Sequence, residues 1–307
     1  MNIKKKIGRK LNGLIRRTQW FKEELFPDCR KFWAYRTFNT DVINLGSTSG
    51  YYAFDYEGIS SVKCGNFALR HNPLSGDQAI LKNYFGYLNP KESLVIISLC
   101  VFSSLAGSYD FMEDRFYTLL SPVSIPHFSY RRQQQVKSWA GSPIKKFPLW
   151  SIYSELKNLL RGKKCKIMSE TEMEKNAQCW IKGWLHEFSV QDFSQPLSLM
   201  NKDGLKDASD ILNEMISFCK ERNITPTLVL PPMYHTLAEK FDAQARKVLL
   251  YDLIDTIEDK SVKFLNYMDD DRFSHDPSMF QNSFLLNKSG AKKFTSIVLK
   301  DIGVIKA

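Results

Sequence analysis

The run Ser93-Leu-Val-Ile-Ile-Ser-Leu-Cys-Val101 is the segment that most restricts how this chain folds. It is almost continuously apolar and follows a turn at Asn89-Pro-Lys-Glu92. A strand of a parallel sheet has this composition, because helices cover both faces of the sheet and leave no face for polar side chains. The run therefore predicts a buried strand within a parallel sheet.

Shorter apolar runs and helical patterns alternate along the rest of the chain. We expect strands at Val42–Leu45, Val62–Leu69, Thr225–Leu230 and Val262–Asn266, and helices at Asp77–Leu88, Leu149–Leu160, Asp207–Arg222, Phe241–Ile257 and Gly290–Leu299. Strands that alternate with helices favour an α/β fold, here a flavodoxin-like three-layer α/β/α sandwich with a mainly parallel sheet.

The 307 residues are enough for one large or two modest domains. We expect a basic N-terminal segment at residues 1–38 and an α/β domain at residues 39–307. Residues 107–205 are less regular and contain five prolines, which predicts an insertion or cap over one edge of the sheet. The aromatic side chains of this insertion either line a substrate cleft or pack the insertion onto the core.

Basic residues are concentrated at the N-terminus of a chain whose net charge is +10. Residues 1–17 contain seven lysines and arginines and no acidic residue. Apolar side chains recur among them at helical spacing, which predicts a basic amphipathic helix (Ile3, Ile7, Leu11, Leu14 and Ile15). Either residues 1–21 bind an anionic membrane surface, or the helix is solvated or packs against another subunit. The rest of the chain has no basic stripe and no recognisable binding motif, so we do not expect a nucleic-acid partner.

Several expectations follow from what the composition lacks. No apolar stretch approaches the ~18 residues needed to span a bilayer, and the basic N-terminus lacks the apolar region of a secretory signal. The six cysteines are scattered without a CxxC pair, which favours a reduced, cytoplasmic compartment, peripheral at the inner membrane face if the helix binds lipid. The acidic run Asp269–Asp271 has no second ligand cluster, so we expect neither a metal nor a cofactor.

Ser47 is the first candidate for chemistry. It lies in Asn44-Leu-Gly-Ser-Thr-Ser-Gly50, where a short apolar strand breaks into a glycine- and serine-rich turn. Glycines let the backbone approach a substrate closely, and N–H groups in such a turn can face a developing oxyanion. Ser47 is therefore either a nucleophile or an ordinary turn serine. The carboxyl ends of the other strands supply residues that can meet it in one cleft.

The order of these pieces resembles the SGNH (GDSL-like) hydrolase superfamily, in particular uncharacterised members found with bacterial surface-polysaccharide genes. The matching segments are Asn44–Ser49, Cys64–Phe67, Ile211–Pro232 and Phe280–Phe294, within residues 40–105 and 207–300. The resemblance implies that Ser47 is the nucleophile and that the backbone N–H of Gly65, beside Asn66, contributes to the oxyanion hole.

The same resemblance exposes a departure in the last block. The family has Asp-x-x-His-Leu-Asn there, with the histidine as general base and the aspartate orienting it. This chain has Asn282 and Leu285 at those two positions, so the usual base is missing. A histidine from elsewhere must then activate Ser47. His235 and His275, which follow strand ends, are the leading candidates, ahead of His71, His127 and His186.

The resemblance and this departure from it imply two functions from different classes. The first is a carbohydrate O-acyl esterase or O-acyltransferase of bacterial surface-polysaccharide metabolism, with a Ser47 acyl-enzyme and an acylated carbohydrate or acyl donor as its partner. The second is a non-catalytic protein of the same fold that binds or scaffolds components of polysaccharide assembly. A peripheral membrane protein that acts mainly through its basic helix is a third, weaker alternative.

Overall fold

The computed structural model describes residues 3–106, 114–125, 127–148, 150–153, 157, 167–195 and 199–306. The chain is divided into two compact units. Unit 1 combines residues 1–34 with residues 110–165, and unit 2 combines residues 35–109 with residues 166–307. The predicted insertion at 107–205 is thus divided between the units. Its first half shares unit 1 with the basic N-terminal residues.

Unit 2 is built on a five-stranded sheet in which every strand is parallel to its neighbours, in the order β2-β1-β3-β4-β5. The strands are β1 (Val42–Gly46), β2 (Cys64–Asn66), β3 (Ser93–Ser98), β4 (Ile224–Leu230) and β5 (Lys263–Asn266). This is the flavodoxin-like order, in which successive strands are added on one side of β1 and then on the other, so the strand order reverses between β1 and β3. The predicted α/β fold with a parallel sheet is confirmed.

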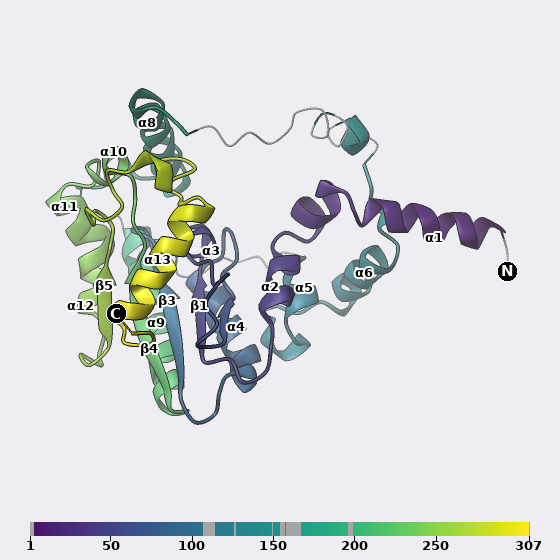
Figure 1. Ribbon diagram of the computed structural model, residues 1–307, viewed down its shortest axis with the longest axis horizontal. Coiled ribbons are helices and arrows are strands. Elements are labelled where there is room, and N and C mark those ends of the chain that lie inside the picture. Colours follow the sequence, from purple (N-terminus) through teal and green to yellow (C-terminus); the bar gives the residue numbers. More distant parts are fainter. Residues whose placement is uncertain are drawn as a thin grey trace. The chain divides into compact units, whose positions relative to one another are not determined.

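Helices cover both faces of this sheet, which makes three layers (Figure 1). α3 (Thr48–Ala53) and α13 (Lys288–Asp301) pack together on one face, where Phe54 and Phe294 meet Ile96 of β3 in one apolar cluster. α4 (Leu74–Tyr84) and α9 (Leu199–Lys220) pack together against β1 and β4. β3 occupies the middle of the sheet, and Val95, Ile96 and Ile97 have no exposed surface, as expected for its continuous apolar sequence.

Most predicted helices are present with shifted ends. α4 begins at Leu74 rather than Asp77, and α9 begins at Leu199 rather than Asp207. The region predicted as one helix from Phe241 is instead a succession of short helices: α11 (Ala243–Arg246), η5 (Lys247–Tyr251) and α12 (Asp252–Asp255). η5 is a π-helical turn, which interrupts the i to i+4 hydrogen bonds. The helix predicted at Leu149–Leu160 lies largely outside the described residues.

The remaining elements of unit 2 are α8 (Glu170–Glu187), α10 (His235–Ala238), η2 (Phe85–Tyr87) and η6 (Pro277–Met279). A reciprocal capping box starts α8: the Ser169 hydroxyl accepts the Glu172 N–H, and the Glu172 carboxylate accepts the Ser169 N–H. α8 falls within the stretch predicted as an irregular insertion. Its cap and its buried Met173, Ala177 and Trp184 show that it is a regular part of unit 2.

Unit 1 consists of short helices from two distant parts of the sequence. They are α1 (Ile3–Ile15), η1 (Trp20–Leu25), α2 (Cys29–Tyr35), α5 (Phe116–Leu119), η3 (Pro122–Ser124), α6 (Tyr130–Gly141) and η4 (Pro143–Lys145). A buried ion pair joins the two parts, because the Arg115 Nη1 lies 2.9 Å from the Asp28 Oδ2 and both side chains are almost fully buried. None of the described helices combines the length and apolarity required to cross a membrane.

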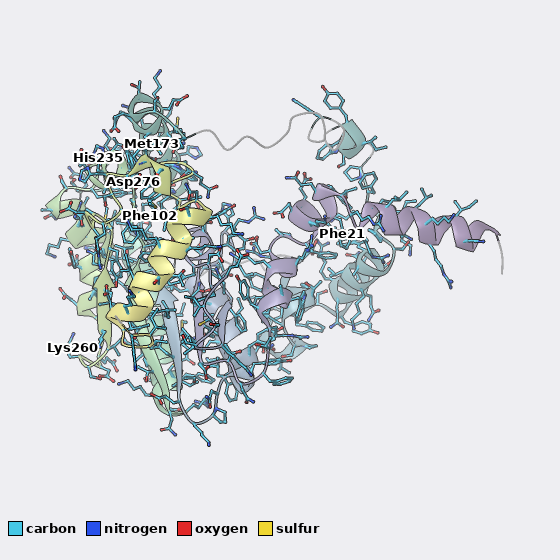
Figure 2. The ribbon with its side chains drawn as sticks, viewed as in Figure 1. Phe21, Phe102, Met173, His235, Lys260 and Asp276 are labelled. Atoms are coloured by element: carbon cyan, nitrogen blue, oxygen red, sulfur yellow. The ribbon has the colours of Figure 1, made fainter. Side chains whose placement is uncertain are left out.

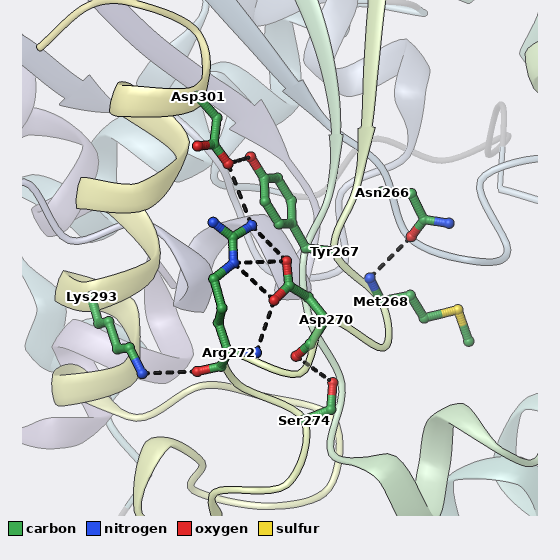
Figure 3. Close-up of polar contacts among 8 residues, drawn as sticks. All are labelled: Asn266, Tyr267, Met268, Asp270, Arg272, Ser274, Lys293 and Asp301. Atoms are coloured by element: carbon green, nitrogen blue, oxygen red, sulfur yellow. Dashed lines mark hydrogen bonds and ion pairs between the residues drawn. The ribbon is translucent and has the colours of Figure 1, made fainter. Parts of the chain in front are cut away.

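The loop after β5 is fastened to α13 by an arginine (Figure 3). The Arg272 guanidinium donates to both carboxylate oxygens of Asp270 and also reaches Asp301 near the end of α13. The Tyr267 hydroxyl donates to the same Asp301 carboxylate, and Lys293 of α13 donates to the Arg272 carbonyl. The guanidinium lowers the pKa of Asp270, so this carboxylate is more stable ionised in the folded protein.

We expect Arg272→Gln to lower the free energy of unfolding at neutral pH by roughly 1 kcal/mol, since the network is half-exposed and partly screened by water. The pKa of Asp270 is depressed, so the stabilisation is present above the ordinary value of 3.8 and is lost as the pH falls through the lowered value. Urea unfolding of both proteins measures this difference across pH. Lys300→Gln, at an exposed position on α13, is the control. An equal loss of stability in both variants would contradict the expectation.

Candidate active site

Ser47 lies directly after β1, at the carboxyl edge of the sheet where the strand order reverses. It is the N-cap residue of α3 with an extended backbone, and its side chain makes no capping hydrogen bond. The Asn72 N–H instead donates to the Ser47 Oγ across 3.1 Å, and the His71 N–H donates to the Thr48 hydroxyl across 3.0 Å. The loop after β2 is thereby held against the serine turn.

A buried carboxylate connects this turn to the same loop. The Asp77 Oδ1 accepts the Gly46 N–H at 3.0 Å and the Asn72 side-chain amide at 2.6 Å. Asp77 is only 1% exposed and Asn72 4% exposed, so these hydrogen bonds form away from solvent, where polar groups need partners. Asp77 therefore joins the residue before Ser47 to the loop after β2.

The serine turn also requires glycine at Gly46. Its φ of 138° is one that L side chains rarely adopt, and a Cβ atom there would lie 2.7 Å from the Ser98 carbonyl oxygen. Gly50, one turn into α3, approaches Ser98 equally closely, since a Cβ on it would lie 2.9 Å from the Ser98 Cβ. The glycines bring the Ser47 turn into direct contact with the end of β3.

A pocket of about 130 Å³ opens at this turn. Three serine-turn residues, His71 and Glu187 form its polar side, and five aromatic rings form most of the remainder. The lining residues are Ser47, Thr48, Ser49, His71, Cys100, Phe102, Ala106, Trp180, Trp184, Glu187, Phe188 and Phe284. A serine hydroxyl, an imidazole and a carboxylate thus share one small cavity.

The aromatic side of the pocket comes mainly from α8. Trp180 and Trp184 stack with ring centroids 5.2 Å apart, and Phe284 meets both rings edge-on at 5.3 and 5.0 Å. Phe102, after β3, lies 4.3 Å from the Trp184 centroid. These rings belong to the apolar cluster at the carboxyl ends of β3 and β4. Both tryptophans lie in the predicted insertion, so its aromatics line a pocket and also pack on the core.

Cys100 is the other potential nucleophile in this lining. Burial raises the pKa of its thiol above the ordinary value of 9.0, which keeps it protonated at neutral pH. A thiol is a far weaker nucleophile than a thiolate. Ser47 and Thr48 are both half-buried hydroxyls between the loop and the first turn of α3, and Ser47 is the one at the position of the predicted nucleophile.

The structure does not bring Gly65 to Ser47. Gly65, on the edge strand β2, pairs with Ile43, four residues before the serine, which corresponds to roughly 13 Å along the strand. Asn66 is 1% exposed, and its amide group donates to the Phe54 and Tyr51 carbonyls while its oxygen accepts from Asn44. Asn66 therefore fastens α3 to the sheet. It is absent from the pocket lining.

The last block reaches the pocket through a different residue from the one the resemblance implies. The Asn282 Oδ1 accepts the N–H groups of Phe284 and Leu285, which closes a tight turn. That turn places Phe284 in the pocket wall and buries Leu285 to 6% exposure in the adjoining apolar cluster. Asn282 has a structural role here, and Leu285 is a core residue.

His235 and His275 gather in a separate cluster. The His235 Nε2 lies 2.9 Å from the Glu170 Oε1, and its Nδ1 lies 3.2 Å from the Glu239 Oε1. The His275 ring stacks on it with centroids 4.6 Å apart, and Figure 2 shows Asp276 in the same region as His235. Because both nitrogens of His235 face carboxylates and neither histidine lines the Ser47 pocket, we withdraw both as the base.

His71 follows a strand end in the sequence, as His235 and His275 do, and this pattern did not distinguish it from them. The structure ends β2 at Asn66 instead of Leu69, so His71 follows in the loop at the carboxyl edge. Its φ of 51° is left-handed, a conformation that histidine tolerates better than most side chains. No sequence pattern indicated that Glu187 lies near Ser47, because Glu187 is the last residue of α8, far from Ser47 in the chain.

The acidic run after β5 is used for ion pairs. Asp269 pairs with Arg246 at 2.6 Å, Asp270 pairs with Arg272, and Asp271 approaches His275 at 3.8 Å. Over the described ranges, no group of three or more His, Cys, Asp or Glu residues is arranged to hold a metal ion. Comparisons with protein-family models and with curated proteins found no match to this chain.

We expect Gly46→Ala to destabilise the protein by roughly 1–3 kcal/mol, since the added methyl group overlaps the Ser98 carbonyl and the backbone is left-handed. Thermal unfolding measures the loss. Gly86→Ala, where an added Cβ has nothing within 4 Å, is the matched control and leaves the midpoint nearly unchanged. Equal midpoints for wild type and Gly46→Ala would refute the close contact between the serine turn and β3.

Proposed function

We propose that this protein is a serine-dependent esterase or acyltransferase in which Ser47 forms an acyl-enzyme. The observation that carries the proposal is that Ser47, His71 and Glu187 line one pocket at the reversal point of the sheet. In open parallel sheets, ligands bind at this point, outside the carboxyl ends of the strands. The resemblance of the serine block to SGNH hydrolases supports the same assignment.

His71 takes the role of the base in this proposal. A serine hydroxyl attacks an ester only when a neighbouring group accepts its proton, and imidazole is the usual acceptor. His71 lies on the loop whose next residue, Asn72, is hydrogen-bonded to the Ser47 Oγ. Glu187 is the carboxylate in the lining that can orient the imidazole and stabilise its charged form. N–H groups in the first turn of α3 can face the oxyanion, since they lack partners within the helix.

The pocket dimensions suggest how an acylated carbohydrate fits. Pockets that enclose a whole small molecule measure ~300–1,000 Å³, and this one measures about 130 Å³. A short acyl group therefore occupies the pocket while the alcohol portion remains outside. The aromatic rings that line the pocket, Trp180 and Trp184 among them, supply apolar contacts for the acyl group. The substrate class proposed is a short O-acyl ester of a carbohydrate, as in bacterial surface-polysaccharide metabolism.

A non-catalytic binding role is the second candidate, and a specific observation favours it. The position of the SGNH base is Leu285, which is buried, and Asn282 uses its oxygen in a turn. On this alternative, the same pocket binds an acylated glycan during polysaccharide assembly without cleaving it. Turnover that depends on both Ser47 and His71 separates the two functions.

We expect Ser47→Ala to lower p-nitrophenyl acetate turnover by on the order of a thousandfold, and His71→Gln by roughly a hundredfold. Only proteins that retain Ser47 should react with a fluorophosphonate probe. Ser289→Ala and His275→Gln are matched controls, since Ser289 is exposed at the start of α13 and His275 lies in the separate cluster.

Other results would change the assignment. Loss of turnover in His275→Gln with full activity in His71→Gln would transfer the role of the base to the other cluster. If turnover is unaffected by Ser47→Ala but acetylated oligosaccharides still bind in calorimetry, the non-catalytic function replaces the catalytic one.

A further inference from the structure

The net positive charge of the protein comes entirely from unit 1. Its two segments, residues 1–34 and 110–165, contain 20 lysines and arginines and 7 acidic residues, a net charge of +13. Unit 2 contains the other 23 basic and 26 acidic residues, a net charge of −3. A unit with such an excess of one charge is attracted to surfaces of the opposite charge.

α1 is attached to the rest of unit 1 by its polar side. Asn12 exchanges hydrogen bonds with Ser142 and Ile144, and the Arg16 guanidinium donates to the carbonyls of Ala140 and Gly141. With ~100° of rotation per residue, Asn12 and Arg16 lie on the side of the helix opposite its apolar stripe.

Most of the apolar stripe of α1 consequently points to solvent, whereas Ile15 at its end is buried. Ile7 is 54% exposed, Leu11 42% and Leu14 59%. An ordinary surface helix has the reverse arrangement, with its apolar side toward the core and its polar side outward. These exposed side chains can therefore contact a separate apolar surface, such as that of a membrane.

Beyond the end of α1, unit 1 contains a pocket of about 600 Å³ whose lining includes no acidic residue. Phe21, Phe26, Cys29 and Trp33 form its apolar side; Figure 2 shows Phe21 just beyond α1. Its cations are Arg16, Arg17, Lys22 and Arg30. Within the described residues, no carboxylate lies within ion-pair distance of Arg17, Lys22 or Arg30.

Unpaired cations beside an apolar floor match one kind of ligand, an amphiphile with an anionic head. Further large side chains of unit 1 are exposed to solvent, as they are in proteins that bind at membrane interfaces (Val123, Tyr130, Trp150, Ile152 and Tyr153). Nucleic acid would match the charge of unit 1, but not the exposed apolar stripe of α1.

We propose that unit 1 is a binding unit for anionic membranes and that its pocket holds one anionic phospholipid. Arg17, Lys22 and Arg30 contact the phosphate headgroup, and Phe21, Phe26 and Trp33 contact its acyl portion. The stripe Ile7, Leu11 and Leu14 inserts at the headgroup level. The binding site is thus a folded unit made from two distant segments, where the sequence alone indicated only residues 1–21. The proposal is independent of any chemistry at Ser47.

Vesicle co-sedimentation of the full chain tests the proposal. Wild-type protein is expected to bind phosphatidylcholine vesicles that contain phosphatidylglycerol, to bind pure phosphatidylcholine poorly, and to lose binding as salt is raised. Reversing three charges in Arg17→Glu/Lys22→Glu/Arg30→Glu is expected to weaken binding by roughly a hundredfold or more. Ile7→Gln/Leu14→Gln, which keeps every charge, is expected to weaken it as well.

The matched control is Lys91→Glu/Lys175→Glu/Lys206→Glu, which makes the same charge change at exposed positions of unit 2 and is expected to retain binding. Circular dichroism of each variant establishes that it is folded. Equal loss in the control, or full binding by the Arg17/Lys22/Arg30 variant, overturns the proposal. So does tight binding to a short oligonucleotide that depends on the three cations but not on Ile7 and Leu14, or dimerisation through α1 without vesicle binding.

Discussion

The buried carboxylate of Asp77 is the interaction on which the geometry of the candidate active site depends. It accepts the Gly46 N–H from the end of β1 and the Asn72 amide from the loop after β2. Those two segments carry Ser47 and His71. A buried polar group is costly unless it is hydrogen-bonded, so these bonds hold the turn and the loop together. Side chains from different strands thereby reach one pocket.

The proposed active site uses a general property of the fold and differs in one respect from the SGNH arrangement that the sequence resembles. Parallel strands end at a common edge, so a serine after β1 and a histidine after β2 are neighbours whatever follows in the chain. The SGNH arrangement takes its histidine from the last block. Here the equivalent position, Leu285, is buried in the apolar cluster beneath Phe284 and α8. The aromatic wall from α8 occupies the region next to the last block, which leaves the loop after β2 as the source of an imidazole.

The two units separate two kinds of physical property. Unit 2 has a slightly negative charge and contains the sheet with the Ser47 pocket, whereas unit 1 has the positive charge and the exposed apolar stripe of α1. If unit 1 binds a membrane, substrates associated with that membrane are brought to the same protein that carries Ser47. The proposed chemistry and the proposed lipid binding are then complementary, although each is tested separately.

The sequence by itself determined the fold class and the position of Ser47, because both depend on local patterns. The continuous apolar run of β3 and the alternation of strands and helices are consequences of burial on both faces of a parallel sheet. The glycine-rich turn after β1 likewise reflects a local backbone requirement at Gly46. The sequence did not determine which histidine lies near Ser47. His235, His275 and His71 all follow strand ends, and local pattern does not distinguish between them.

Only the tertiary structure decided which side chains meet. It placed His71 and Glu187 at the Ser47 pocket and paired His235 with Glu170 and Glu239. It also joined residues 1–34 to residues 110–165, so that a modest basic N-terminus became part of a unit with a charge of +13. The physical reason is the same in both cases. These contacts join residues far apart in sequence, and their partners are selected by packing and burial, which local periodicity does not encode.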